Sequence, residues 1–568
     1  MKSNIQTARK PFWELGLKED HFFLVLAILI GIAAGLAVTA FRLAIENIHK
    51  LVFGSVVEAG HARLIAAPAI AGLVVAILVM RLFPRVRGSG VNQTKAALYI
   101  YDGYIPFRTA VGKFVCSSLA IGAGHSLGPE DPSLQIGAAL ASALGRRLRL
   151  SRDKQRLVAP IGAAAGLSAA FNAPISAILF VIEEVIGRWS AGIFGAVVLA
   201  AVSSVVVTRF FLGSQPFFYI PNVAPPRAGE LLAYAALGVI GAFASAIFSR
   251  AIGGLRARLK ALPRWSLYLQ PAVAGLIIGT VGYFGLPQIM GDGYQYMSLA
   301  MLGHYGWRML GILAGMKILS TTLSFTSGTP GGMFAPSLFI GAMLGGAVGG
   351  VEHILFPHSA GPIATYALVG MGVLFAGFLR APMTSVFMVL ELSGDYSIIV
   401  PVIVANTLSY LISRALVPVP IFDLLTRQDG LILPSMEEQR EQKILRVEDA
   451  MQLPDIPVVA PQLTVTAALE RLQGVGKDAL LIDQRPLGWS GFTREQLQAF
   501  VSQGNGHSEL VKLDRGVFPP LHPDQLLDQA LRLLRNRPFL VVSHRAPPGA
   551  VIGIISVDDV LTAYQNEA

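Results

Sequence analysis

Long apolar segments without charge fill most of the chain up to about residue 425. Residues 22–41 read FFLVLAILIGIAAGLAVTAF. Twenty residues at the α-helical rise of about 1.5 Å match a hydrocarbon core of about 30 Å, so this segment predicts a transmembrane helix. Further apolar segments lie at 63–82, 107–124, 157–184, 191–212, 231–252, 268–286, 309–324, 334–356, 363–392 and 397–416. Glycine and proline interrupt several of them, and membrane proteins tolerate such breaks only where the backbone is buried or lines a cavity.

The pattern changes after Leu425, where short strand-like runs alternate with amphipathic helices. The runs ALLID and FLVVS predict strands, and TVTAALERL predicts a helix. We therefore expect an all-α polytopic membrane domain followed by a small α/β domain. The expected boundaries are 1–425 for the membrane domain, 426–443 for a linker, and 444–503 and 515–568 for two α/β modules.

Composition agrees with a membrane protein, because hydrophobic residues make up 53% of the chain and charged residues only 14%. Soluble domains carry about 25% charged residues, so a soluble enzyme is disfavoured. Disorder, a fibrous repeat and a disulfide scaffold are excluded, and Cys116 is the single cysteine. The formal net charge is +10. Its basic residues cluster near the N-terminus and in 146–156 and 250–264, which marks cytoplasmic loops rather than a nucleic-acid surface.

The membrane domain repeats itself. The heptapeptide PSLQIGA at 132–138 recurs as PSLFIGA at 336–342, a separation of 204 residues. The segment from Ala173 to Glu183 recurs from Ala381 to Glu391, a separation of 208. Two matches in the same order at nearly one separation indicate two homologous halves, expected at about 20–212 and 228–425.

A glycine- and proline-rich turn precedes an apolar helix in each half. The turns read GAGHSLGPEDP and FTSGTPGGMFAP. Helix N-termini present unpaired N–H groups and the positive end of the helix dipole, which together bind anions. Repeated halves with broken helices are typical of transporters, whose sites lie at the repeat interface. Either the two turns converge on one anion, or they are helix breaks with packing roles only.

Several motifs, in this order along roughly residues 20–425, resemble the CLC family of chloride channels and chloride/proton exchangers. The resemblance implies the CLC-type inverted repeat with broken helices. The motifs are Gly88-Ser89-Gly90-Val91, Gly128-Pro129-Glu130-Asp131-Pro132, the run from Gly162 to Glu184, and Gly331-Gly332-Met333-Phe334-Ala335-Pro336.

This resemblance implies a homodimer in which each subunit has its own anion pathway. The Ser89 hydroxyl and the N–H groups of Met333 and Phe334 would face the central anion. Glu130 would be the external gating glutamate, which competes with the anion when ionised and leaves when protonated. Glu184 would be the internal proton-transfer glutamate. A serine at position 89 favours chloride over the nitrate- and fluoride-selective branches.

Three departures from the family pattern bear on anion binding. Pro129 removes an N–H donor and Asp131 adds a second carboxylate beside the gating glutamate. Asn92 replaces a proline of the family. Phe422 aligns with the tyrosine whose hydroxyl usually meets the central anion, so we count Phe422 as an anion-site position that lacks this contact. Lys113 matches a buried lysine of the family.

The C-terminal modules resemble tandem CBS domains, which often bind adenine nucleotides. Ser556 and Asp559 match the Ser/Thr-x-x-Asp pattern whose acid contacts a ribose in CBS proteins. The resemblance thus implies an adenine nucleotide at this pair. The alternative is a pair that serves only dimerisation and stability.

The function indicated is voltage- and pH-sensitive chloride transport, as chloride/proton antiport. A passive chloride channel of the same fold is the alternative. A CBS-regulated cation transporter would need several acidic ligands along the spans, whereas the turns present N–H groups. A membrane enzyme is disfavoured, because the spans carry neither H-E-x-x-H spacing nor a nucleophile constellation.

We therefore expect no catalytic residue, no metal site and no required cofactor, with chloride and protons as substrates. The partners expected are a second copy of the chain and the lipid bilayer, and no nucleic acid. The protein is expected to be a multi-pass protein of a bacterial inner membrane, with its CBS domains in the cytoplasm.

Overall fold

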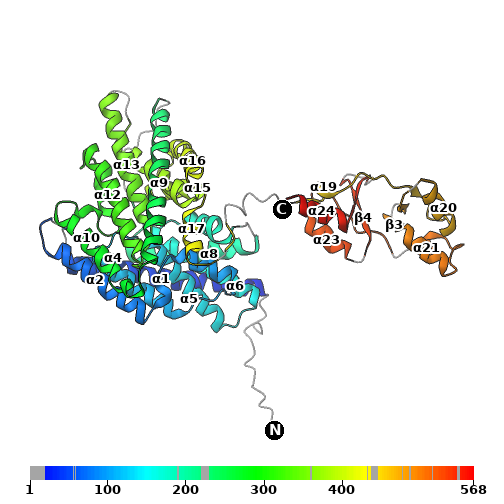
Figure 1. The fold of residues 1–568 in the computed structure, drawn as a ribbon, viewed down its shortest axis with the longest axis horizontal. Helices are drawn as coiled ribbons and strands as arrows, with labels where there is room; N and C mark the ends of the chain where they lie inside the picture. The colour runs from blue at the N-terminus through cyan, green and yellow to red at the C-terminus, as the bar shows by residue number, and fades with distance from the viewer. Residues whose placement is uncertain are drawn as a thin grey trace, which may run out of the picture. The chain divides into compact units, whose positions relative to one another are not determined.

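The computed structural model divides into two compact units, Met1–Arg440 and Glu441–Ala568. Figure 1 shows an α-helical membrane unit and a C-terminal unit of mixed strands and helices. The residues described are 19–54, 57, 59–187, 191–215, 217–218, 229–357, 361–431, 433–435, 445–475, 477–484, 488–513, 516–535, 537–545 and 550–567.

The membrane unit is built from helices of very different lengths. The first half contains α1 (Glu19–Phe53), α2 (Arg63–Arg81), α3 (Gly90–Tyr99), α4 (Phe107–Gly122), α5 (Glu130–Arg147), α6 (Arg152–Phe171), α7 (Pro174–Phe180), a π-helical turn η3 (Val181–Ile186) and α8 (Ala191–Leu212). The second half contains α9 (Glu230–Lys260), α10 (Gln270–Tyr283), α11 (Tyr294–Met301), α12 (Trp307–Thr326), α13 (Phe334–Leu355), α14 (Ile363–Leu379), α15 (Pro382–Ser393), α16 (Ile399–Leu416) and α17 (Ile421–Gln428). Short 3-10 turns lie at Pro84–Val86, Arg264–Tyr268 and Pro287–Ile289.

The structure confirms the membrane character of the unit. Within the described residues, seven helices are long and apolar enough to cross a membrane. They are His21–Phe53, Arg63–Arg81, Ile193–Leu212, Glu230–Lys260, Trp307–Thr326, Phe334–Leu355 and Ile399–Gln428. Helix α5, expected as the helix after the first glycine-rich turn, is enclosed by protein and carries polar residues, which is why it is not among the long apolar segments.

Two of the predicted apolar segments are interrupted in the structure, as expected for segments that contain glycine and proline. Residues 157–184 break at Asn172, which has φ +54°, and residues 363–392 break at Arg380, which has φ +62°. Each break directly precedes an Ala-Pro pair, and proline cannot continue a helix because it lacks an N–H and its ring clashes with the preceding turn. The two breaks occupy equivalent positions in the two halves, so the repeat extends to the helix ends.

Small residues let equivalent helix pairs approach closely in both halves. A Cβ on Gly137 of α5 would lie 2.1 Å from the carbonyl oxygen of Gly162 in α6. A Cβ on Gly341 of α13 would lie 2.2 Å from the carbonyl oxygen of Gly370 in α14. Glycine is therefore needed where these backbones meet, as is typical of helix pairs in membranes.

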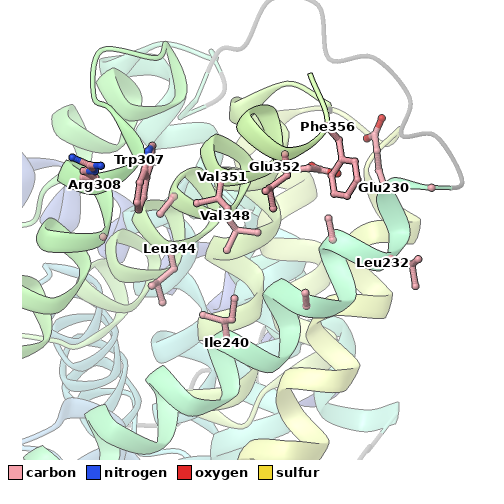
Figure 2. A pocket seen from close by; sticks show the side chains of 16 residues that line it. Glu230, Leu232, Ile240, Trp307, Arg308, Leu344, Val348, Val351, Glu352 and Phe356 are labelled. Carbon is pink, nitrogen blue, oxygen red and sulfur yellow. The ribbon is translucent and has the colours of Figure 1, made fainter. Parts of the chain in front are cut away.

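An apolar groove of about 980 Å³ lies between α9, α12 and α13. Figure 2 shows Ile240, Leu344 and Val348 along the groove, with Glu230 and Glu352 toward one end. None of the residues lining the groove belongs to the motifs singled out in the sequence. The groove therefore does not contribute to the candidate ion site.

The C-terminal unit is α/β, as predicted. Its strands are β1 (Val458–Val459), β2 (Ala479–Asp483), β3 (Trp489–Thr493), β4 (Phe539–Ser543) and β5 (Val551–Ser556). Its helices are α19 (Val447–Ala450), α20 (Val465–Val475), α21 (Arg494–Ser502), α22 (Leu510–Leu513), α23 (Leu527–Leu534) and α24 (Val557–Glu567). In one sheet β2 pairs parallel to β1 and antiparallel to β3, and in the other β4 pairs antiparallel to β5.

Each sheet has its own buried core, one containing Leu480 and Phe492 and the other Leu540 and Ile555. This arrangement agrees with two modules, whose exact boundaries stay predictions. The predicted linker 426–443 begins inside α17, which continues to Gln428. Most of the rest of that linker lies outside the described residues.

Candidate anion and proton pathway

The two glycine-rich turns meet each other. The Gly128 N–H donates to the Gly332 carbonyl at 2.8 Å, and the Gly332 N–H donates to the Gly128 carbonyl at 2.8 Å. These two glycines are equivalent in the repeat, so the turns join at the axis that relates the halves. Helices α5 and α13 begin two residues later, at Glu130 and Phe334. The two turns therefore lie side by side, as convergence requires, and whether they bind one anion stays a prediction.

Glu130, the first residue of α5, is fully buried and reaches across to the second half. Its carboxylate accepts a hydrogen bond from the Ala335 N–H at 3.2 Å, in the first turn of α13. Its other oxygen accepts the Tyr294 hydroxyl at 2.5 Å. A carboxylate thus lies at a helix N-terminus, the place where an anion is stabilised by unpaired N–H groups.

Asp131 makes the equivalent contact with a different helix. The N–H groups of Gly90 and Val91, at the start of α3, donate to its two carboxylate oxygens at 2.8 and 3.1 Å. The Ser89 hydroxyl donates to the same carboxylate at 2.9 Å. The side chain predicted to face the central anion therefore faces Asp131 in this structure.

A buried lysine supports the turn before α3. Lys113 lies on α4, and its ammonium group donates to the carbonyls of Val86 and Gly88 at 3.1 and 2.9 Å. The same group is 4.0 Å from Asp131. Its counterpart Lys317 donates to two carbonyls of the equivalent turn, at 3.0 and 2.8 Å. Both halves therefore hold their turn with an ammonium group.

The remaining anion-site positions lie among buried aromatic rings. Met333 precedes α13 and Phe334 begins it. The Phe334 ring centroid is 4.9 Å from that of Phe180 and 6.4 Å from that of Phe422. The Asn92 amide donates to the Phe422 carbonyl at 2.9 Å, which ties α3 to α17. Phe422 thus lies beside α13 and presents an apolar ring there.

Glu184 lies in the π-helical turn η3 and is buried. Its carboxylate is 2.6 Å from the Lys95 ammonium, which is itself 3.5 Å from Asp423. All three groups are largely removed from solvent. A π-helical turn inside a helix frequently marks a functional site, and buried ionisable groups at membrane depth normally serve transport.

Glu183, the neighbour of Glu184, caps a helix of the second half. Its carboxylate accepts the N–H and the hydroxyl of Thr384, with the N–H at 2.9 Å. Its repeat counterpart Glu391 accepts the N–H and the hydroxyl of Ser176, with the N–H at 2.7 Å. Each half therefore caps a helix of the other half, and these two glutamates hold the halves together.

A cavity of about 540 Å³ borders the Glu130 region. Its lining includes Pro129, which precedes Glu130 in the chain, Tyr294, whose hydroxyl donates to Glu130, and the charged side chains of Arg42, Lys50 and Asp292. Two immediate neighbours of Glu130 therefore line this cavity.

Comparison with known proteins decides the family. A protein-family model described as voltage gated chloride channel matches residues 71–414.

The chain belongs to the CLC family.

A relative in the same family is the H+/Cl− exchange transporter ClcA of Salmonella arizonae, 31% identical over 410 residues that cover 70% of this chain and 87% of that protein. Among solved structures, a slow cyanobacterial Cl−/H+ antiporter covers 73% of this chain and 98% of its own, with a TM-score of 0.67 and 24% identity. A eukaryotic CLC transporter covers 95% of this chain and 99% of its own, with a TM-score of 0.63 and 20% identity. These structural likenesses establish a CLC fold.

Three residues of this CLC site were not predicted. Tyr294 had a signal, because Gly291-Asp292-Gly293-Tyr294 repeats the Gly88-Ser89-Gly90-Val91 motif 203 residues later. Lys95 and Asp423 stand in segments without distinctive local pattern. An ionisable residue within the membrane region is nevertheless a functional candidate by default.

In the C-terminal unit, the Ser556 and Asp559 pair forms a helix cap. The Asp559 carboxylate accepts the Ser556 N–H at 2.8 Å and its hydroxyl at 2.7 Å, and the Asp559 N–H donates back at 3.3 Å. Thr493 and Gln496 make the same reciprocal arrangement at α21. A capping box accounts for the motif locally, so nucleotide binding at this pair stays a prediction.

Proposed function

We propose that this CLC protein exchanges chloride for protons across a membrane, with Glu130 as the external gate and Glu184 as the internal proton-transfer residue. The observation that carries the proposal is the fully buried Glu130 carboxylate at the N-terminus of α13. The ionised Glu130 carboxylate has the same charge as chloride. At the N-terminus of α13 it therefore occupies hydrogen-bond donors that chloride needs.

Competition for those donors supplies the coupling. An ionised Glu130 holds the Ala335 N–H and the Tyr294 hydroxyl, so an anion at α13 must displace it. A protonated Glu130 has no charge to compete with, and the anion takes its place. Proton binding and anion binding at this site are therefore linked, because each favours the same displaced state.

The second proton station is supported by the Lys95–Glu184 pair. A carboxylate buried in this region is costly unless it is paired, and the Lys95 ammonium at 2.6 Å meets that requirement. Its position in η3, a different element from the α13 terminus that holds Glu130, suits a separate proton step. The name of the Salmonella relative, an H+/Cl− exchange transporter, agrees with proton-coupled chloride exchange.

A passive chloride channel of the same fold is the second candidate. Phe422 favours it, since its ring supplies no hydroxyl to an anion beside α13. Loss of one anion contact weakens the link between anion occupancy and proton movement. A coupling measurement decides between the two candidates.

We also propose the wider setting of the protein. It acts as a homodimer with one pathway in each subunit, in a bacterial inner membrane. The bacterial source of the relative supports this location. The C-terminal unit is a cytoplasmic CBS pair, and its two small sheets, each with its own core, support the pair of modules. An adenine nucleotide would bind at Ser556 and Asp559, which match the ribose-contacting pattern.

The test is ion flux from purified full-length protein in liposomes. A chloride gradient is imposed, internal pH and chloride are recorded, and potassium with valinomycin clamps the voltage. We expect chloride to drive protons uphill in the unmodified protein, and Glu184→Gln to abolish proton movement while chloride flux persists. Chloride flux without proton movement in the unmodified protein would instead establish the channel.

A further inference from the structure

We propose that Asp131 is a second tethered carboxylate, which holds the N-terminus of α3 and must be displaced before an anion reaches Ser89. This inference rests on the proposed function and adds a residue that determines anion affinity. It follows from the contacts of a side chain that has no counterpart in the second half, where Ala335 occupies the equivalent position.

The donors on Asp131 are those that an anion at α3 would use. A hydroxyl and two successive N–H groups reach the carboxylate at 2.9, 2.8 and 3.1 Å. The Ser89 hydroxyl has one proton, so while it donates to Asp131 it cannot donate to chloride. An anion that bonds to Ser89 therefore takes the hydroxyl from Asp131.

Asp131 is also at the point where the halves meet. A Cβ added at Gly332 would lie 2.7 Å from the Asp131 Cβ, so the side chain packs directly against the second turn. It is 2% exposed. The carboxylate thus lies between the start of α3 and the turn that leads into α13.

The charge of the Asp131 carboxylate makes it compete with chloride for the donors at the start of α3. The Lys113 ammonium at 4.0 Å compensates the Asp131 charge without a transported ion. An incoming chloride meets a like charge on the donors it needs, and like charges this close repel strongly when buried. Glu130 and Asp131 are adjacent in sequence but hold different helices, α13 and α3. Two carboxylates, not one, therefore stand between the anion and its donors.

The alternative is that Asp131 only caps α3 and stabilises the fold. The two roles predict opposite results when its charge is removed. A competitor weakens chloride binding, so the neutral variant binds chloride more tightly. A purely structural cap maintains the site, so the neutral variant binds chloride equally well or less tightly.

The experiment is chloride titration calorimetry on the full-length protein, unmodified and as Asp131→Asn. Asparagine keeps the size of the side chain and removes its charge. We expect the chloride Kd to fall by about tenfold or more, because one buried like charge is removed. Asp131→Gly is measured in parallel, and it replaces Asp131→Asn if that variant does not fold. Asp153→Asn on the exposed start of α6 is the matched control, and its Kd should not change.

Thermal unfolding with and without chloride provides a second readout. Greater stabilisation by chloride in Asp131→Asn than in the unmodified protein supports competition. A chloride Kd that is unchanged or raised, with a lower Tm that chloride does not restore, overturns the inference.

The same preparations enter the liposome assay, which separates the two proposals. If the unmodified protein exchanges chloride for protons but Asp131→Asn binds chloride no more tightly, the Asp131 inference alone fails. If the unmodified protein moves no chloride, the proposed function fails, and any chloride binding is then judged by calorimetry alone.

Discussion

In the first half of the membrane unit, α5 begins with Glu130 and Asp131, whereas in the second half α13 begins with Phe334 and Ala335. The same difference appears further along the repeat, where Glu184 stands opposite Leu392. The first half thus supplies three buried carboxylates of the candidate pathway, and the second half supplies one, Asp423. The second half supplies aromatic rings and helix N–H groups.

Other charged groups, in contrast, are present in both halves. Lys113 and Lys317 hold equivalent turns, and Glu183 and Glu391 cap each other's half. Burying a charge in a membrane protein is costly, so each of these groups needs a compensating role. The comparison teaches that repeated charges build the scaffold, whereas unrepeated charges are the candidates for transport.

The largest expected effect comes from removing the gate. Glu130→Gln keeps the size of the side chain but never becomes ionised, so it cannot carry a proton. We expect proton movement in liposomes to be lost entirely while chloride still crosses. Glu448→Gln, half-exposed in the C-terminal unit, is the matched control. Proton coupling that survives in Glu130→Gln would contradict the assignment of the unrepeated carboxylates.

The next effect concerns the unrepeated ion pair. Lys95→Met removes the ammonium group that lies 2.6 Å from Glu184 and 3.5 Å from Asp423. Removing one partner of a buried pair destabilises a protein by about 3–5 kcal/mol. We expect a loss of that size in thermal or denaturant unfolding, together with a changed proton-to-chloride ratio. Lys95→Arg keeps the charge and should recover most of the stability. A loss of stability with an unchanged proton-to-chloride ratio would show that Lys95 has a structural role only.

Breaking the reciprocal caps should affect stability alone. Glu183→Gln and Glu391→Gln each weaken charge-assisted hydrogen bonds to a helix N-terminus, at about 1–3 kcal/mol. Because the two caps are equivalent, we expect similar losses in free energy of unfolding and an unchanged proton-to-chloride ratio among the molecules that remain folded. A ratio altered in Glu391→Gln would show that a repeated charge takes part in transport.

The smallest expected effect comes from adding a hydroxyl to the aromatic cluster of the second half. Phe422→Tyr adds a hydroxyl beside α13 and changes little else in the aromatic cluster. A new hydrogen bond of about 0.5–1.5 kcal/mol would lower the chloride Kd by about 2–10-fold. Calorimetry checks this, with Phe375→Tyr in the same aromatic cluster as control. An unchanged Kd would mean that the ring at position 422 does not face the anion.

The sequence by itself determined the features that local pattern controls. Apolar length predicted most of the long helices, the repeat predicted two halves, and alternation predicted the strands β2 and β4. The glycine-rich turns were predictable because glycine permits conformations that other residues avoid and proline fixes φ and ends helices, and both effects act within a few residues. The family resemblance pointed to Glu130 and Glu184, and the structure places both as buried carboxylates.

Only the tertiary structure decided which partners these carboxylates have. Tyr294 is 164 residues from Glu130, and Lys95 is 89 residues from Glu184. Asp131 appeared in the sequence as an extra carboxylate, and only the fold places it on Ser89, 42 residues away. Pattern along the chain reports hydrophobicity and backbone preference, which are local. The ion pairs and helix caps depend on how the two halves pack, so they exist only once the chain is folded.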